Sequence, residues 1–138
     1  MSINHFYAPL QKAFSLGNNF LNELDTHPVG PILSYEELKS LWNWDLPEKG
    51  KPAEEVIEEL NESTIPGLNL NQSGRFFAWV IGGSHPSAIA ADWLTSVWDQ
   101  NAGLYACTPS SGIVEEIAGS WLKQLLKLPP QASFAFVT

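Results

Sequence analysis

Apolar residues recur three or four positions apart along most of the chain, the spacing that places them on one face of an α-helix. The pattern predicts helices at five places, joined by proline- and glycine-containing connectors. They are residues 9–25, a helix opening at Ser34, a helix opening at Pro52, a helix from Pro86, and residues 112–128. We therefore expect a mostly α segment without an obvious compact core in its first part.

Local signals support three of these helix starts. Ser34 is followed three residues later by Glu37, which is the pattern of a capping box. Pro86 is suited to the first turn of a helix, with His85 before it as a candidate cap. The helix after Pro52 begins with several glutamates, and we interpret these as a solvated face at a helix N-terminus rather than as catalytic carboxylates.

The helix from Pro86 has an unusually wide apolar stripe. Ile89, Trp93 and Val97 recur every four residues, with further apolar residues beside them. A stripe of this width is typical of a helix that is covered on most sides. We therefore expect this helix to be deeply buried.

Two short segments rich in aromatic and β-branched residues, 76–81 and 133–138, are predicted to be buried strands or extended segments. Strands leave no backbone donors or acceptors unpaired when they are buried, and these two segments would make at most one marginal pair. The pattern therefore predicts that the chain is a truncated part of a larger domain.

Gly82 and Gly83 separate the first of these segments from the following helix. Glycine can adopt φ > 0 or allow another group to approach closely. Two interpretations stay open: a tight turn between two core elements, or the rigid edge of a pocket.

Composition narrows the class of protein. The net charge is −8, which disfavours nucleic acid and anionic membrane surfaces as partners. No apolar run approaches the roughly 18 residues of a spanning helix, and the first residues do not resemble a secretory signal. The single cysteine, Cys107, cannot form an internal disulfide and fits a reducing compartment, so we expect a cytoplasmic protein.

The residues give little sign of independent catalysis. The six lysines lie on polar helix faces or in charged loops, where a lysine stays protonated and weakly nucleophilic. The three histidines lack the spacing of metal ligands, so no metal site is expected. His85 is interpreted as a helix cap, and Cys107 has no visible partner for nucleophilic chemistry.

The stretch RFFAWVIGG followed by HPSAIAADWLTSVWDQNA resembles the N-terminal part of the pyridoxal-phosphate-dependent amino acid decarboxylases. This is group II, which includes aromatic-L-amino-acid and glutamate decarboxylases of fold type I. The resemblance continues through Pro109-Ser110-Ser111 and Trp121-Leu122 to Leu128-Pro129. It covers the later part of the chain closely and the first third loosely.

The resemblance implies an α/β parent fold, the fold type I transferase fold, with this segment mostly α. Residues 1–70 would form a helical N-terminal arm that lies across the partner subunit of a homodimer. Residues 71–138 would begin the large domain, truncated before the loop that binds the cofactor phosphate, with Thr138 at its border. The implied reaction is removal of the α-carboxylate of an amino acid, with pyridoxal 5'-phosphate as cofactor.

The resemblance also implies where the substrate lies. It places two loops beside the substrate pocket, and the candidate residues are Gly82, Gly83, Ser84, His85, Asn101, Leu104 and Tyr105. The lysine that holds the cofactor and the acid that pairs with its ring nitrogen would lie beyond Thr138, so no catalytic residue is expected here and the chain alone is expected to be inactive. The turn reads Val-Ile-Gly-Gly-Ser where aromatic decarboxylases have proline, threonine and aromatic residues, which argues against a preference for aromatic substrates. Two alternatives stay open: another fold type I reaction, by an aminotransferase or lyase, and a non-catalytic helical interaction fragment.

Overall fold

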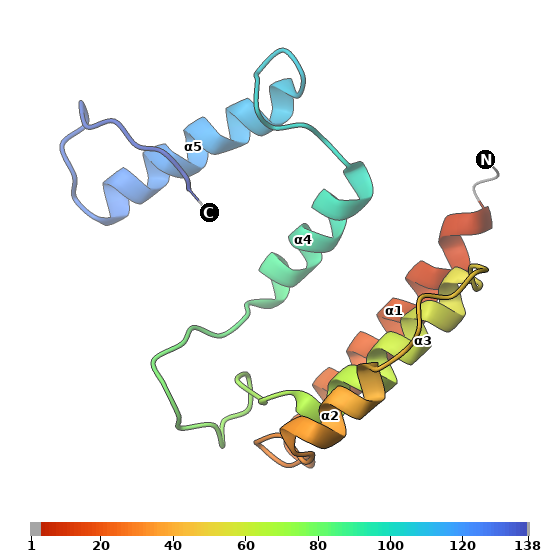
Figure 1. The fold of residues 1–138 in the computed structure, drawn as a ribbon. Coiled ribbons are helices and arrows are strands. Elements are labelled where there is room, and N and C mark those ends of the chain that lie inside the picture. The colour runs from red at the N-terminus through yellow and green to blue at the C-terminus, as the bar shows by residue number, and fades with distance from the viewer. Residues whose placement is uncertain (1–3, 138) are drawn as a thin grey trace. The chain divides into compact units, whose positions relative to one another are not determined.

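The computed structural model describes residues 4–137, which form five α-helices and one short 3-10 helix (Figure 1). The chain divides into two compact units, one ending at Ser84 and the other beginning at His85. The predicted division at residue 70 concerns domains of a larger enzyme and stays a prediction. The described helices confirm that the segment is mostly α.

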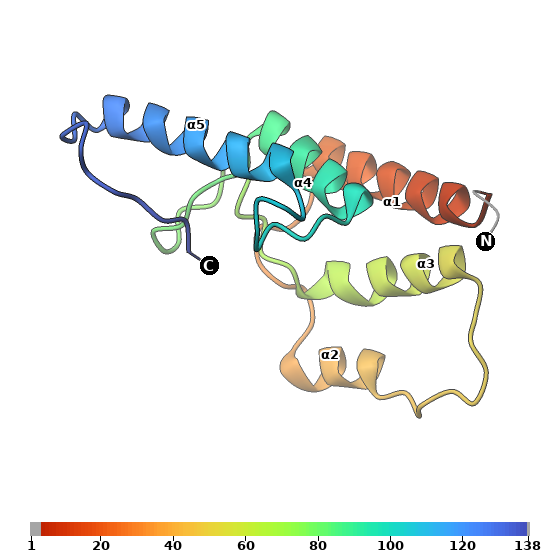
Figure 2. The same ribbon diagram turned by 90° about the horizontal axis from the view of Figure 1, so that it is seen from above.

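The first unit is built on two long helices, α1 (Asn4–Glu23) and α3 (Ala53–Thr64), which lie side by side (Figures 1 and 2). Their apolar faces meet because each presents Leu, Ile or Phe residues at helical spacing. An ion pair of 3.1 Å between Lys12 Nζ and Glu58 Oε1 adds a polar contact between the two helices. The helix expected to start at Pro9 begins at Asn4 instead, since a proline removes one backbone hydrogen bond without ending a helix.

The short helix α2 (Tyr35–Trp42) has the predicted capping box. The backbone N–H and the hydroxyl of Ser34 donate to Glu37 Oε2 at 2.8 and 2.7 Å, and Glu37 N–H donates back to Ser34 Oγ at 3.4 Å. After α3, the 3-10 helix η1 (Ile65–Gly67) lies against α2, where Leu38 is so close to Gly67 that an added Cβ would be 3.0 Å from Leu38 Cδ2.

The core of the first unit is small and lies where two connectors meet. Leu70 is the buried large hydrophobic residue among those described, and its N–H donates to Val29 O at 2.9 Å. Ile32 N–H donates to Pro66 O at 3.0 Å. These two backbone bonds fix residues 65–73 against the connector that comes after α1.

The second unit contains α4 (Pro86–Trp98) and α5 (Pro109–Leu125). α4 begins at Pro86, as predicted. α5 begins at Pro109, three residues before the predicted start, because a proline fits the first turn of a helix. It ends before Leu128 because Leu126 is its C-cap and Lys127 adopts a left-handed conformation with φ 53°.

The two predicted strands are not found in the structure. Residues 4–137 contain no β-strand, and the segments 76–81 and 132–137 have irregular backbone. Phe77 is 92% exposed and Val137 is 90% exposed, so neither segment is buried as expected. A strand needs a neighbouring strand for its backbone hydrogen bonds, and the described part of the chain supplies no such strand to these segments.

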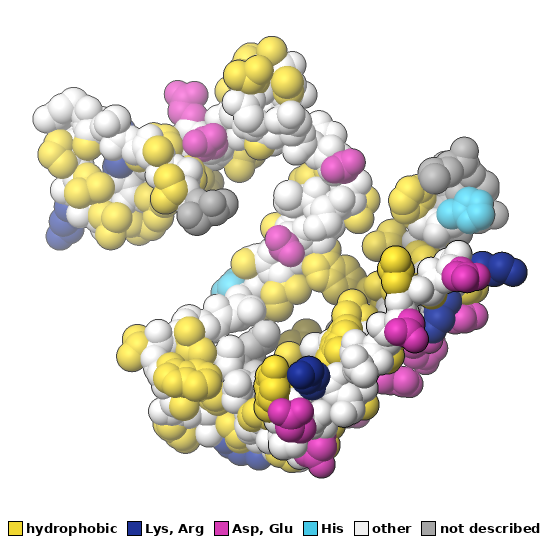
Figure 3. Space-filling model, in the orientation of Figure 1, with side chains coloured by type: hydrophobic (Ala, Val, Ile, Leu, Met, Phe, Trp, Pro, Cys, Tyr) yellow, Lys and Arg dark blue, Asp and Glu magenta, His cyan; other side chains and the backbone are white. Residues whose placement is uncertain are grey.

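The apolar face of α4 is also uncovered within this chain, contrary to the prediction. Trp93, Leu94, Val97 and Trp98 are 38–59% exposed. Figure 3 shows hydrophobic side chains, in yellow, on the visible surface of both units. Exposed apolar patches of this kind are typical of a segment that packs against further protein. Within residues 4–137, none of the helices has both the length and the apolarity that crossing a membrane requires.

Candidate functional site

The glycine turn at the end of the first unit carries the first group of candidate residues. Gly82 and Gly83 do not adopt positive φ, and a Cβ added to either would meet no atom within 4 Å. Within the described residues, these glycines therefore use neither of the two capacities that the sequence suggested, φ > 0 or the close approach of another group. The left-handed residue of this segment is Trp79, with φ 55°, a conformation that a bulky side chain adopts only rarely.

Gly82 and Ser84 lie beside the end of α1. They line a small cavity of about 130 Å³ together with Phe20, Leu24 and residues 69–72. Most of its lining is polar, because residues 69–72 contribute two asparagines and a glutamine. The structure thus brings two candidate residues to one polar hollow within the first unit.

His85 caps α4, as the sequence predicts. Its Nδ1 accepts a hydrogen bond from Ser87 N–H at 3.3 Å and lies 2.8 Å from Ser87 Oγ. One ring nitrogen of His85 is therefore engaged in capping the helix. Whether the residue also contacts substrate stays a prediction.

The second group of candidates lies in the loop between α4 and α5. Asn101 Oδ1 accepts from Gly103 N–H at 2.9 Å, and Asn101 O accepts from the hydroxyl of Thr108 at 2.9 Å. Thr108 is only 6% exposed and closes the loop at the start of α5. Leu104 and Tyr105 project from this closed loop and are 66% and 65% exposed.

Tyr105 packs against the first turns of α5. A Cβ added to Gly112 would lie 3.0 Å from Tyr105 Cδ2, so the glycine makes room for the ring. A separate large hollow of about 810 Å³ lies along the same unit, between Thr95 and Trp98 on α4, Val114 on α5 and Phe136. The remaining predicted residue, Thr138, lies outside the described residues.

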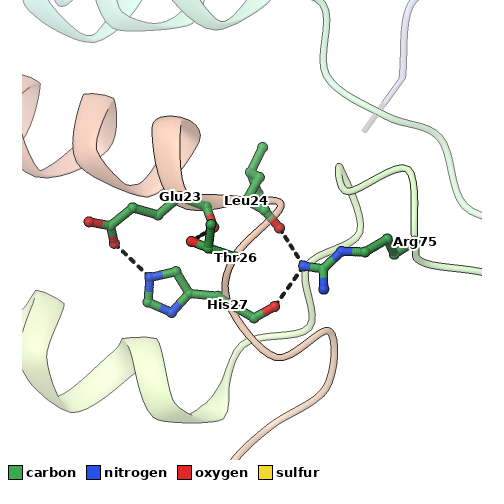
Figure 4. Close-up of polar contacts among 5 residues, drawn as sticks. All are labelled: Glu23, Leu24, Thr26, His27 and Arg75. Atoms are coloured by element: carbon green, nitrogen blue, oxygen red, sulfur yellow. Dashed lines mark hydrogen bonds and ion pairs between the residues drawn. The ribbon is translucent and has the colours of Figure 1, made fainter.

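A cluster around Arg75 was not predicted from the sequence. Arg75 Nη2 donates to Leu24 O at 2.9 Å and to His27 O at 2.7 Å, two carbonyls at the end of α1 (Figure 4). His27 Nε2 in turn lies 2.6 Å from Glu23 Oε2. α1 has no basic residue in its own last turn, so this arginine supplies the cation that a helix C-terminus favours. The only sequence signal was that Arg75 is the single arginine in the chain.

The six lysines of the chain are either exposed or already paired. Lys12 is paired with Glu58 at 3.1 Å, and Lys51 with Glu59 at 2.5 Å. Lys123 donates to two backbone carbonyls of the segment after α5. The others are exposed: Lys39, Lys49 and Lys127. A lysine amine becomes a good nucleophile in a desolvated pocket, and exposed or paired lysines lack that setting, so the expectation that the cofactor is anchored elsewhere stays a prediction.

The described residues include no group of three or more histidine, cysteine, aspartate or glutamate side chains that could hold a metal ion. Cys107 is exposed, and its backbone N–H donates to Leu104 O at 3.0 Å as part of the closed loop. Cys107 thus contributes a backbone hydrogen bond to this loop.

Comparison with known proteins gives the family. Residues 36–135 match the pyridoxal-dependent decarboxylase conserved domain. Tryptophan decarboxylase 1 of Oryza sativa subsp. japonica is 27% identical over 120 residues, which are 87% of this chain and 23% of that protein. Aromatic-L-amino-acid decarboxylase of Rattus norvegicus is 25% identical over 111 residues, which are 80% of this chain and 23% of that protein.

Solved structures agree. The crystal structure of Oryza sativa TDC with PLP and tryptamine matches 94% of this chain and 26% of its own length, with a TM-score of 0.82 and 25% identity. The structure of Rhodiola rosea 4-hydroxyphenylacetaldehyde synthase matches 94% of this chain and 28% of its own, with a TM-score of 0.80 and 22% identity, and shows the shared fold. The chain thus spans about a quarter of the length of these relatives, and it shares the fold of these pyridoxal-phosphate-dependent enzymes, which is fold type I. It belongs to the pyridoxal-dependent decarboxylase family.

Proposed function

We propose that the protein carrying this chain is a decarboxylase that removes the α-carboxylate of an amino acid with pyridoxal 5'-phosphate as cofactor. In this reaction the bond between Cα and the carboxylate breaks, carbon dioxide leaves, and a proton takes its place on Cα. The observation that carries the proposal is the family match over residues 36–135. Because the six lysines are exposed or already paired, we propose that the lysine that anchors the cofactor lies outside these 138 residues.

Within that enzyme, this chain would contribute one wall of the substrate site. The polar hollow beside Gly82 and Ser84 offers neutral hydrogen-bonding groups rather than a charge. Such groups orient a polar substrate without holding it so tightly that product cannot leave. Leu104 and Tyr105, exposed on a closed loop, offer apolar surface for contact with substrate or with a partner subunit.

We further propose a homodimer in the cytoplasm. The uncovered apolar faces of both units support the dimer, because stable homodimer interfaces are more apolar than the rest of a protein surface. A single exposed thiol, Cys107, fits a reducing compartment.

The relatives also favour a second candidate function. One of them is the 4-hydroxyphenylacetaldehyde synthase of Rhodiola rosea, which is 26% identical over 117 residues. In this second candidate the product is an aldehyde rather than an amine, so the reaction also consumes dioxygen and water and releases ammonia and hydrogen peroxide with the carbon dioxide. Decarboxylation is the first choice because the matching conserved domain is that of decarboxylases.

The test is an assay of the purified protein, supplemented with pyridoxal phosphate, against each standard amino acid. Release of carbon dioxide with the matching amine supports decarboxylation. Release of the matching aldehyde supports the second candidate. Carbon dioxide from no amino acid would overturn both.

A further inference from the structure

We propose that Arg75 is a positioning residue: by binding the end of α1, it holds the segment 76–84 in place and so couples the helical arm to substrate binding at the turn. This inference rests on the proposed function. The inference goes beyond the proposed function because it names Arg75, which contacts none of the candidate site residues, as a residue that sets substrate affinity.

The side chain of Arg75 is a strong anchor. One guanidinium nitrogen donates two hydrogen bonds, to Leu24 O at 2.9 Å and to His27 O at 2.7 Å. These carbonyls lie just after α1 (Asn4–Glu23), where the helix dipole is negative and favours a cation. Hydrogen bonds from a charged donor are shorter and stronger than neutral ones. Figure 4 shows the guanidinium pointing at both carbonyl oxygens.

The backbone around Arg75 is also held. Ser73 is 5% exposed, and its N–H donates to Leu70 O at 2.9 Å. Arg75 N–H donates to Ser73 Oγ at 3.3 Å, and Phe76 N–H donates to Ser73 O at 3.0 Å. Side chain and backbone together therefore fix the chain up to Phe76 on the small core around Leu70.

The segment beyond Phe76 has little support of its own. Among the described residues, 77–84 donate no backbone hydrogen bond, and the rings of Phe76 and Trp79 pair with their centroids 5.8 Å apart. Trp79 also adopts the left-handed conformation, which is unfavourable in free energy for a non-glycine residue and so adds no stability to the segment. The position of the segment therefore depends on the anchor before it.

Leu24 connects the anchor to the polar hollow. Its carbonyl binds Arg75, and the same residue lines the cavity that Gly82 and Ser84 line. The same end of α1 thus carries both the attachment point and one wall of the hollow. Release of Arg75 would free the segment to move away from that wall, so substrate would bind more weakly while the chemistry itself stayed intact.

The test compares Arg75→Gln, Arg75→Lys and, as a control for lost charge, Lys49→Gln in the exposed loop before α3. Two readouts are used in the protein that carries this chain: steady-state kinetics, and chymotrypsin cleavage mapped by mass spectrometry. For Arg75→Gln we expect cleavage at residues 76–79 to rise and KM to rise, each about tenfold, with kcat within about twofold, as expected when hydrogen bonds from a charged group are lost. Cleavage at Trp42 and Trp44, in the same unit, should stay unchanged. Arg75→Lys should recover part of both effects, and Lys49→Gln should show neither.

Unchanged cleavage at residues 76–79 in a folded Arg75→Gln protein would overturn the proposal, because the arginine would then not hold this segment. Equal increases in cleavage at Trp42 and Trp44 would also overturn it, because the arginine would then stabilise the whole unit rather than the segment. If Arg75→Gln does not fold, the decision rests on Arg75→Lys. Cleavage at residues 76–79 and KM that both rise by less than about tenfold, with kcat unchanged, support the proposal. Wild-type cleavage and KM in that variant, or a reduced kcat with wild-type cleavage, contradict it. If the wild-type protein decarboxylates no amino acid, the proposed function fails, and the cleavage comparison alone decides on the anchor.

Discussion

The ring of Phe134 lies directly against Gly119 in the middle of α5. A Cβ built on this glycine would overlap the ring carbons Cε2 and Cζ of Phe134. Gly119 is buried, and the ammonium of Lys123 lies 5.7 Å from the centre of the same ring. The absence of a side chain at one helix position therefore sets where the segment after α5 lies.

Gly119→Ala should displace Phe134 and destabilise the second unit. Alanine favours a helix over glycine by up to about 1 kcal/mol, but forced overpacking costs about 1–3 kcal/mol, so we expect a net loss. Urea titrations, which give the free energy of unfolding, measure this loss of stability. Gly112→Ala on the same helix is the control: its nearest neighbour is Tyr105 Cδ2 at 3.0 Å, a ring on an exposed loop residue that can move aside. A Gly119→Ala protein as stable as the Gly112→Ala protein would contradict this account.

The capping box of α2 should depend on pH. Hydrogen bonds from the Ser34 hydroxyl and then from the Ser34 backbone hold the pKa of Glu37 below its ordinary value of 4.5. Because the folded pKa is the lower one, the stabilisation is fully present above pH 4.5 and is lost as the pH falls through the folded pKa. NMR titration of the Glu37 carboxyl measures this pKa.

Ser34→Ala is the matched variant for that titration. It removes the hydroxyl, which is the main cause of the shift, so the pKa of Glu37 should move back toward 4.5. α2 should also fray at neutral pH, where the wild-type helix is intact. If the pKa of Glu37 is the same in the wild-type protein and in Ser34→Ala, the capping box has no influence on the carboxylate and this account is contradicted.

Valine at Gly82 or Gly83 should harm substrate binding more than folding. Neither glycine has positive φ, and open space surrounds both, so the free energy of unfolding should change by less than about 0.5 kcal/mol. The branched side chain would narrow the hollow that Gly82 lines, and KM should rise. Gly74→Val, also in open space, is the control. A loss of stability that matches the loss of activity would make the turn purely structural.

The 138-residue chain by itself should self-associate, because the apolar face of α4 is uncovered within it. Sedimentation velocity over a range of concentrations measures this. Val97→Glu should reduce association, whereas Ser96→Glu, one residue away with the same change of charge, should reduce it less. A sharp monomer at every concentration would count against the interpretation of this face as an interface.

The sequence predicted the helices and their caps because those signals are local. The Ser34–Glu37 box and the His85 cap each involve residues at most three positions apart. The prediction of two strands was wrong because strand formation depends on a neighbouring strand, about which a local sequence pattern carries no information. The Arg75 anchor joins residues 51 and 48 positions apart, and the Gly119–Phe134 contact is likewise nonlocal, so periodicity gave no sign of either. Trp79, and not one of the nearby glycines, adopts the left-handed backbone conformation, which composition alone does not reveal.

The most direct test of the central claim is to treat the purified 138-residue chain with pyridoxal phosphate, reduce it with borohydride, and map labelled lysines by mass spectrometry. The claim is that this chain contributes an arm and one wall of a substrate site while the cofactor is anchored elsewhere. We predict only weak labelling that is spread over exposed lysines and does not saturate, because each of the six lysines is exposed or already paired and none lies in a desolvated pocket. Saturable labelling of one specific lysine, in a one-to-one ratio, would contradict the account and place the catalytic centre within this chain.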